Sequence, residues 1–407
     1  MINSYKFDVI KTGFYILLIT ALSRPIISVI EGKTPLPLHK ILPAGFYYLL
    51  FLFLFLSFST IDWDIVSITI LSFCSYAILS LAWGSNFNSL VEILFPFIGY
   101  FTAKTFVKEY SRVKLIFLAF VVGYFIPIIG SAILMLFKLS VSYEVYGSGA
   151  LRQHGLYVGF HTAAHSMVLF SFLYASFLTF KHSTRTIFQY AVHSVFLLSI
   201  YCLLNTYVRS AMLAFLLFWM VCLIRWKKRF FFLFLFVLIG MGIWQSSAIQ
   251  TVFWKADTWD RERNIETASS GRTILWSHNL NLFKEMPFYK KILGSGLGTE
   301  SKRVIGGEDE IWSSHNDFIA LLMTLGIIGL LFYLFIFTFL ILDIILYSNN
   351  DGPQSIILAA IVASLFTSMV TNGYIFRIEA SQTFWILMGC AHTYIKRTPD
   401  QMIPEFA

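Results

Sequence analysis

Apolar segments long enough to cross a lipid bilayer recur along the whole chain, and they restrict its fold more than any other feature does. A membrane-spanning helix needs roughly 20 consecutive apolar residues. The fourth segment is the weakest, because Glu92 and Pro96 interrupt it, and a re-entrant segment is the alternative there. We therefore predict an all-α integral membrane protein with about twelve transmembrane helices, at about 12–30, 42–60, 65–83, 88–107, 113–138, 160–180, 186–204, 208–224, 229–247, 317–345, 354–372 and 380–396.

The scarcity of charged residues excludes most soluble classes of protein. Charged residues make up 13% of the chain and hydrophobic residues 57%, whereas soluble domains carry about 25% charged residues. The net charge of +8 requires no nucleic acid, because cytoplasmic loops of membrane proteins carry excess lysine and arginine. We expect membrane lipid as the surroundings, and neither disulfides nor a zinc site from the four cysteines, which all lie in apolar segments: Cys74, Cys202, Cys222 and Cys390.

Basic residues between the apolar segments predict the orientation of the helices. With twelve spans, one face collects the basic clusters at 104–114, 181–185, 225–229 and 396–397. Such clusters stay in the cytoplasm. The opposite, outer face then receives the loops at 139–159, 204–208, 248–314 and 373–379.

The segment 248–314 is a polar loop of 67 residues in an otherwise apolar chain. It contains nine lysines and arginines and nine acidic residues. This loop divides the chain into an N-terminal bundle of about nine spans (1–247), the large outer loop itself (248–314), and about three C-terminal spans with a short tail (315–407). Because its charges balance, anion binding there must come from individually placed arginines.

Two arginines on the outer face have the sequence context of phosphate ligands. Arg209 stands at the head of the eighth span, where an arginine either reaches the interface or faces a ligand. Arg272 follows Ser270-Gly271 and precedes a predicted helix at 273–285. A helix N-terminus beside a guanidinium suits an anion, although a solvated loop arginine is the alternative.

A histidine lies where the chain enters the tenth span. His315 belongs to Ser314-His315-Asn316-Asp317, and histidine exchanges protons near neutral pH as a general base must. The alternatives are a polar anchor at the interface and a helix cap formed by Asn316. Arg152 and Arg377, also on the outer face, are weaker candidates for binding an anion.

Two other motifs favour ordinary structure over chemistry. Asp62-Trp63-Asp64 has a spacing that can hold a metal, but the predicted topology puts it on the cytoplasmic face, away from the arginines. Gly294–Gly298 has no strand–helix context, so it indicates a turn and not a nucleotide loop. We therefore predict no metal and no cofactor.

The order of these motifs resembles the O-antigen ligase family, which includes lipopolysaccharide ligases and related polysaccharide polymerases. The resemblance covers about residues 200–345, and it rests on Arg209-Ser210, Ser270-Gly271-Arg272-Thr273, Trp276, Pro287, Gly294-Ser295-Gly296-Leu297-Gly298, His315-Asn316 and Gly326-Ile327-Ile328-Gly329.

This resemblance implies an inverting, metal-independent membrane glycosyltransferase of the C-type fold, in a bacterial inner membrane with its active site toward the periplasm. The donor would be a glycan on undecaprenyl diphosphate and the acceptor a sugar hydroxyl of lipid A–core. Arg209 and Arg272 would bind the diphosphate and His315 would activate the hydroxyl. The alternatives are a polymerase that uses the same donor and a flippase or transporter for lipid-linked oligosaccharide.

Overall fold

The computed structural model describes residues 2–30, 38–144, 151–157, 159–179, 186–225, 272–299, 316–347, 352–370 and 378–395. Eleven of the twelve predicted spans coincide with helices in these ranges, and the ninth, 229–247, lies outside them. The helices up to the large loop are α1 (Ile2–Ile30), α2 (Leu38–Leu56), α3 (Ile65–Leu79), α4 (Phe87–Phe106), α5 (Tyr110–Leu136), α6 (Phe160–Thr179), α7 (Thr186–Thr206) and α8 (Arg209–Arg225). The described part of the loop contains α12 (Arg272–Glu285) and α13 (Phe288–Leu293), and the helices after the loop are α14 (Asp317–Tyr347), α15 (Gly352–Val370) and α16 (Ile378–Ile395).

Short elements complete the described fold. Two 3-10 turns flank α3, η1 (Phe58–Thr60) before it and η2 (Ser80–Trp83) after it. The segment between α5 and α6 contains a two-stranded antiparallel hairpin of β1 (Ser142–Glu144) and β2 (Leu151–Gln153), in which Tyr143 pairs with Arg152. The sequence does not predict this hairpin, because strands of three residues carry too little periodic signal.

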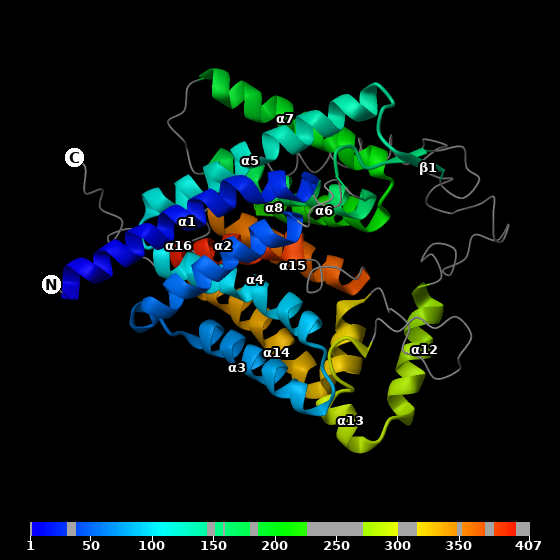
Figure 1. Ribbon diagram of the computed structural model, residues 1–407. Helices are drawn as coiled ribbons and strands as arrows, with labels where there is room; N and C mark the ends of the chain where they lie inside the picture. Colours follow the sequence, from blue (N-terminus) through cyan, green and yellow to red (C-terminus); the bar gives the residue numbers. More distant parts are fainter. Residues whose placement is uncertain are drawn as a thin grey trace.

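The long helices form one bundle (Figure 1). Extensive contacts join α4 with α16, α1 with α5, α8 with α15 and α3 with α14. Each helix that follows the large loop therefore packs against a helix that precedes it. Aromatic contacts connect these partners, including Phe97 with Trp385, whose ring centroids are 4.7 Å apart.

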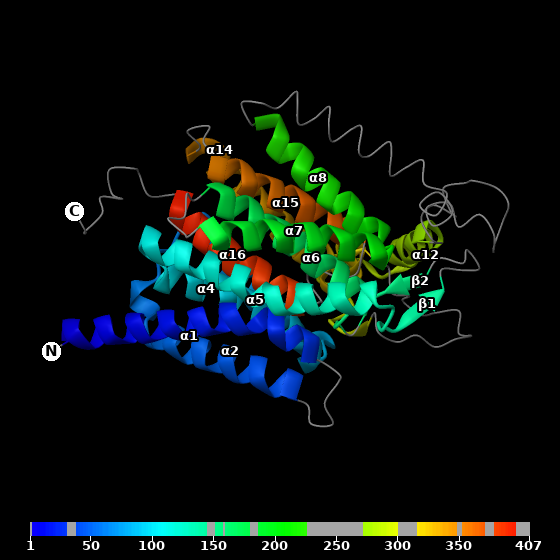
Figure 2. The ribbon, with the colours of Figure 1, turned by 90° about the horizontal axis from the view of Figure 1, so that it is seen from above.

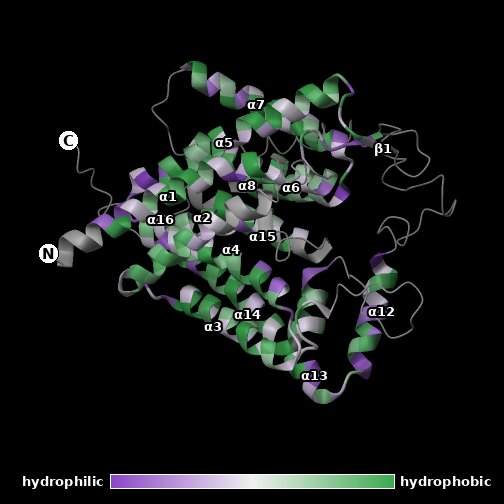
Figure 3. Cartoon of the chain, viewed as in Figure 1, coloured by the Kyte–Doolittle hydropathy of each residue, from purple (hydrophilic) through white to green (hydrophobic). Residues whose placement is uncertain are grey.

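The outward-facing side chains are those of a membrane protein. Among the residues that the structure describes, six helices are long and apolar enough to cross a bilayer: Asp8–Val29, Ile65–Trp83, Tyr110–Leu136, Phe160–Thr179, Thr186–Thr206 and Asp317–Leu346. Large apolar side chains remain exposed on their surface, such as Ile187 at 81% and Leu346 at 75%. Figure 3 shows α3 and α14 as mainly hydrophobic along their length, whereas α12 mixes hydrophilic with hydrophobic residues. The chain is thus a helical, multi-pass membrane protein.

The fourth predicted span is a continuous helix. α4 runs from its N-cap Asn86, whose side chain accepts a hydrogen bond from the backbone N–H of Asn88, to Phe106. Pro96 lies inside α4 without dividing it, and the second half of the helix is buried. α4 packs extensively against α16, but it is not among the described helices that length and hydropathy mark as able to cross a bilayer, so the choice between a crossing and a re-entrant segment stays a prediction.

The bundle has two distinct ends (Figures 1 and 2). α1 begins and α16 finishes at one end, which we call the terminal end. The β1–β2 hairpin, α12 and the start of α8 lie at the other, which we call the hairpin end. Arg152, Arg209 and Arg272 all lie on the elements of the hairpin end.

Candidate functional site

Arg209 is the first residue of α8 and follows a sharp turn after α7. The Thr206 hydroxyl, which donates to the carbonyl of Leu203, accepts a hydrogen bond from the N–H of Val208 at 3.4 Å. Tyr207 adopts a left-handed backbone with φ of 50°, a conformation that costs on the order of 1–3 kcal/mol for a residue with a side chain. The prediction that Arg209 stands at the head of the eighth span is confirmed, and its side chain is half-buried there.

Arg152 reaches this turn from the hairpin. Its Nη2 donates to the carbonyl oxygen of Tyr207 at 3.4 Å, and its guanidinium lies over the ring of Phe160, 5.0 Å from the ring centroid. The tertiary structure therefore joins Arg152 to the turn that presents Arg209, although 57 residues separate them in sequence. Two guanidinium groups near one turn make this part of the hairpin end cationic.

The hairpin is held against the C-terminal end of α5. Ser140 Oγ accepts from the N–H of Gly155 at 3.0 Å, and Ser131 Oγ accepts from the N–H of Leu156 at 3.1 Å. The next residue, Tyr157, is fully buried. Its burial raises the pKa of its phenol well above the ordinary value, so Tyr157 stays neutral and adds no charge beside the arginines.

Arg272 is the first residue of α12, which confirms the helix predicted at 273–285. Its side chain is half-buried. α12 contacts α14, and α13 connects α12 to the glycine-rich segment 294–298. The position of Arg272 thus depends on how α13 and this segment are fixed to α14.

A break in α14 receives the glycine-rich segment. Gly326, with φ of 67°, interrupts the helix, and the carbonyls that lose their partners there turn toward the segment. Ser295 N–H donates to the carbonyl of Met323 at 3.0 Å, and Gly296 N–H donates to that of Thr324 at 2.9 Å. The hydroxyl of Tyr76 on α3 donates to the carbonyls of Leu293 and Leu325, each at 3.1 Å.

Glycine is required where these backbones meet. A Cβ on Gly294 would lie 2.2 Å from the carbonyl oxygen of Thr324, and one on Gly326 would lie 2.3 Å from that of Ile292. The segment also bonds to the turn before α4, where the N–H of Asn86 donates to the carbonyl of Leu297 at 2.7 Å. We call these contacts among 84–86, 293–298 and 323–326 the backbone knot. The predicted turn at Gly294–Gly298 is confirmed, and its role is to fix α13 to α14.

The start of α14 is shaped by Asn316. The Oδ1 of this residue accepts from the N–H groups of Phe318 at 3.0 Å and Ile319 at 3.1 Å, so it is the helix cap that the sequence predicted as one alternative. Asp317, fully buried in the first turn, was not singled out from the sequence. His315 and Arg377 lie outside the described residues, so their roles stay predictions.

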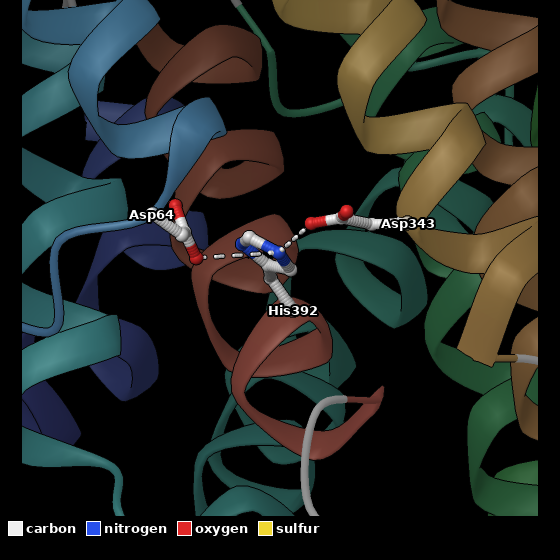
Figure 4. A group of neighbouring side chains, drawn as sticks. All are labelled: Asp64, Asp343 and His392. Carbon is white, nitrogen blue, oxygen red and sulfur yellow. Dashed lines mark hydrogen bonds and ion pairs between the residues drawn. The ribbon is translucent and has the colours of Figure 1, made fainter.

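A second polar cluster lies at the terminal end (Figure 4). His392 Nε2 donates to Asp343 Oδ2 at 2.7 Å and lies 3.6 Å from Asp64 Oδ2, while the hydroxyl of Tyr100 is 2.6 Å from His392 Nδ1. Lys104 Nζ pairs with Asp64 Oδ2 at 2.5 Å. We call these five residues the terminal cluster.

The three potential ligand atoms of Asp64, Asp343 and His392 lie within 4.8 Å of one another, a spacing compatible with a metal ion. However, the ammonium of Lys104 and the Nε2 of His392 already bond to the carboxylate oxygens that a metal would need. The cluster therefore acts as an ionic connection among α3, α4, α14 and α16. Asp64 also caps α3 by accepting from the N–H of Ser67 at 2.9 Å, which accounts for the second acid of Asp62-Trp63-Asp64.

Part of the chain is similar to a known protein family. A model of the family described as O-antigen ligase matches residues 194–334. A search of curated proteins found no match. The matched segment begins in α7 and finishes in α14, so it contains Arg209, Arg272 and His315, while Arg152 and Arg377 lie outside it. The resemblance based on short motifs is thereby confirmed.

Proposed function

We propose, on the premise that a model of the family described as O-antigen ligase matches residues 194–334, that the protein transfers a glycan from undecaprenyl diphosphate to a sugar hydroxyl of lipid A–core. The protein lies in a bacterial inner membrane with its hairpin end toward the periplasm. The large loop 248–314 then faces the periplasm between the N-terminal bundle (1–247) and the C-terminal helices (315–407). The reaction uses neither a metal nor another cofactor.

The chemistry requires a stabilised leaving group and an activated nucleophile. The acceptor oxygen attacks the anomeric carbon of the donor sugar as the bond from that carbon to the diphosphate oxygen breaks, which inverts the configuration. Undecaprenyl diphosphate departs with the bonding electrons. Arg209 and Arg272 bind its oxygens, because a guanidinium fork holds phosphate through two parallel hydrogen bonds. His315 accepts the proton of the hydroxyl.

The observation that carries this proposal is the cationic turn formed by Arg152 and Arg209. Arg152 bonds to the carbonyl of Tyr207, two residues before Arg209. A negatively charged leaving group gains most where guanidinium groups are already positioned, because little reorganisation is needed as charge develops. Arg152 is therefore a positioning residue for Arg209, and Arg377 remains a weaker diphosphate ligand in this proposal.

The proposed role of His315 is supported by the cap that follows it in sequence. Asn316 bonds to two backbone N–H groups of α14, which ties the chain next to His315 to the helix start. A general base must be held within hydrogen-bond reach of the proton it accepts. The backbone knot connects the same helix to α13 and α12, and hence to Arg272.

The decisive experiment offers purified protein a lipid-linked glycan together with lipid A–core. His315→Ala should reduce transfer by about a hundred- to ten-thousand-fold, the usual contribution of a general base. His278→Ala, which removes a histidine from α12, is the matched control. Full activity of a folded His315→Ala protein would exclude the base role.

The arginine roles and the acceptor are tested in the same assay. Arg272→Ala should raise the donor concentration needed for half-maximal rate, whereas Arg112→Ala, at the terminal end beside Glu109, should not. If the product is an elongated lipid-linked glycan and lipid A–core stays unmodified, the protein is a polymerase. Movement of lipid-linked glycan across vesicles without any transfer would identify a flippase.

A further inference from the structure

A buried cation in α1 lies outside the proposed diphosphate site. Arg24 is 4% exposed, and its Nε donates to the Oε1 of Gln382 on α16 at 2.9 Å. A charged side chain among apolar helices is costly unless an opposite charge or several hydrogen bonds compensate it. The single described bond of Arg24 goes to a neutral amide, so the charge itself still needs a counterpart.

Among the residues that the structure describes, no carboxylate forms an ion pair with Arg24. The ion pairs between lysine or arginine and an acid there are Lys104–Asp64 and Arg112–Glu109. A guanidinium has five N–H donors, and the described contacts use one of them. Arg24 therefore has donors available for an acceptor that does not come from the described parts of the chain.

Gln382 independently points to the same kind of partner. Its side chain is fully buried, and its Nε2 meets no hydrogen-bond acceptor among the described residues. Such an unmet buried donor costs about 1–3 kcal/mol. Arg24 and Gln382 thus bring together donors that lack acceptors, which is the pattern expected around a bound anion with several oxygens.

The site lies among three closely packed helices in the half of the bundle toward the hairpin end. A Cβ on Gly123 of α5 would lie 2.4 Å from the carbonyl oxygen of Leu22, so α1 and α5 are in backbone contact beside Arg24. Arg24 precedes the last residue of α1 by six positions, and Gln382 follows the first residue of α16 by four. α1 begins and α16 finishes at the terminal end, so both residues lie toward the opposite end (Figures 1 and 2).

We propose that Arg24 and Gln382 form a second phosphoryl-binding site, which takes a phosphate group carried by a lipid. Guanidinium and amide donors match phosphoryl oxygens, and the surrounding helices are apolar, which suits a ligand with a hydrocarbon chain. The choice of phosphate over other anions rests on the proposed function, which brings a lipid diphosphate to the hairpin end.

The test measures binding by protein in which the first site has been removed. Arg209→Ala and Arg272→Ala together form this background, and undecaprenyl diphosphate is titrated in detergent. We expect the background to retain binding, and Arg24→Gln added to it to weaken the affinity at least ten-fold. Arg24→Lys should weaken it less, because a lysine keeps the charge but loses the fork.

Gln382→Glu is the second variant, and it is the control that separates loss of binding from misfolding. Its carboxylate would neutralise Arg24 from within the protein, so we expect a higher melting temperature without lipid and at least ten-fold weaker lipid binding. Loss of binding in this stable variant cannot be attributed to unfolding. Unchanged affinity in both Arg24→Gln and Gln382→Glu, or a background without any binding, would overturn the proposal.

Two further probes distinguish the source of the phosphate. Inorganic diphosphate tests whether the lipid chain is needed, and phosphatidylglycerol bicelles test whether a bilayer phospholipid competes. Arg24-dependent binding of either probe identifies that source for the site. Protein that transfers no glycan, yet shows Arg24-dependent lipid binding, would contradict the proposed function and leave the second site intact.

Discussion

Arg152 of β2 donates to the carbonyl oxygen of Tyr207 across 3.4 Å, and this bond joins the hairpin to the residue with a left-handed backbone before α8. The contact fixes the turn from which Arg209 projects. A hairpin of two three-residue strands would have little stability alone, but here it is held by α5, by Phe160 and by this bond. The hairpin therefore acts as a support for the head of α8.

The first prediction concerns this support. Arg152→Ala should lower kcat/KM for glycan transfer about ten-fold or more, because a hydrogen bond from a charged group contributes about 1.5–3 kcal/mol. If Arg152 positions Arg209, the loss should be divided between kcat and the donor KM, and Arg152→Lys should restore part of it. A change in melting temperature alone, with normal kinetics, would indicate a purely structural role.

The second prediction concerns the backbone knot. Gly326→Ala should destabilise the protein by more than the 1–3 kcal/mol typical of overpacking, because a Cβ would meet a carbonyl oxygen at 2.3 Å and the backbone φ is 67°. Thermal unfolding in detergent provides the measurement. Gly45→Ala in α2 is the matched control, since a Cβ there meets nothing within 4 Å, and it should be neutral or stabilising.

Tyr76 provides the third prediction. Tyr76→Phe removes one hydroxyl that serves two carbonyls in the broken region of α14, those of Leu293 and Leu325. We expect a stability loss of about 1–3 kcal/mol, because both acceptors lose a partner. Tyr48→Phe, at a side chain that is 68% exposed, should change the melting temperature little. Equal effects of the two substitutions would contradict the bonding role of Tyr76.

The fourth prediction concerns the cap of α14. Asn316→Ala should reduce stability by about 1 kcal/mol, the usual value of an N-cap. It should also reduce transfer more than this loss of folded protein explains, because the cap holds the residue that follows His315. Asn316→Asp retains an acceptor at the cap and should recover most of both properties. A variant that is less stable but fully active per folded molecule would separate the cap from catalysis.

The fifth prediction separates the two ends of the bundle. Asp343→Asn in the terminal cluster removes the charged partner of His392, and breaking such a buried pair typically costs about 3–5 kcal/mol. The melting temperature should therefore fall clearly. Molecules that remain folded should transfer glycan at nearly the normal rate, since the cluster lies at the terminal end. A selective loss of activity would show that this cluster takes part in the reaction.

Several elements of the fold could be predicted because their causes are local. A segment of about 20 apolar residues has no other stable state than a spanning helix, since lipid offers its backbone no hydrogen bonds. This explains why α2 to α8 and α14 to α16 were located within a few residues, whereas α1 ends where predicted but begins ten residues before the predicted start. The helix α12 and the cap at Asn316 were also predictable, because propensity and capping depend on neighbours in sequence.

The candidate site was predictable only in part. Arg209 and Arg272 were identified from the sequence as residues at helix heads. The role of Arg152, in contrast, depends on its hydrogen bond to the carbonyl of Tyr207, 55 residues away in sequence. Asp343 and His392 could have been marked as ionisable residues inside spans. Arg24, inside the first predicted span, could have been marked by the same rule.

The sequence by itself determined that this chain is a helical membrane protein, where most of its helices begin and end, and which short motifs resemble the O-antigen ligase family. These properties follow from hydropathy, from the need of backbone N–H and C=O groups in lipid for hydrogen-bond partners, and from local helix capping. All three act over a few neighbouring residues. Only the tertiary structure decided that Gly294 meets the break at Gly326, that Arg152 supports the turn before Arg209, and that Arg24 lies against Gln382. Such contacts join distant segments through close packing, and no local pattern in the sequence specifies which segments will meet.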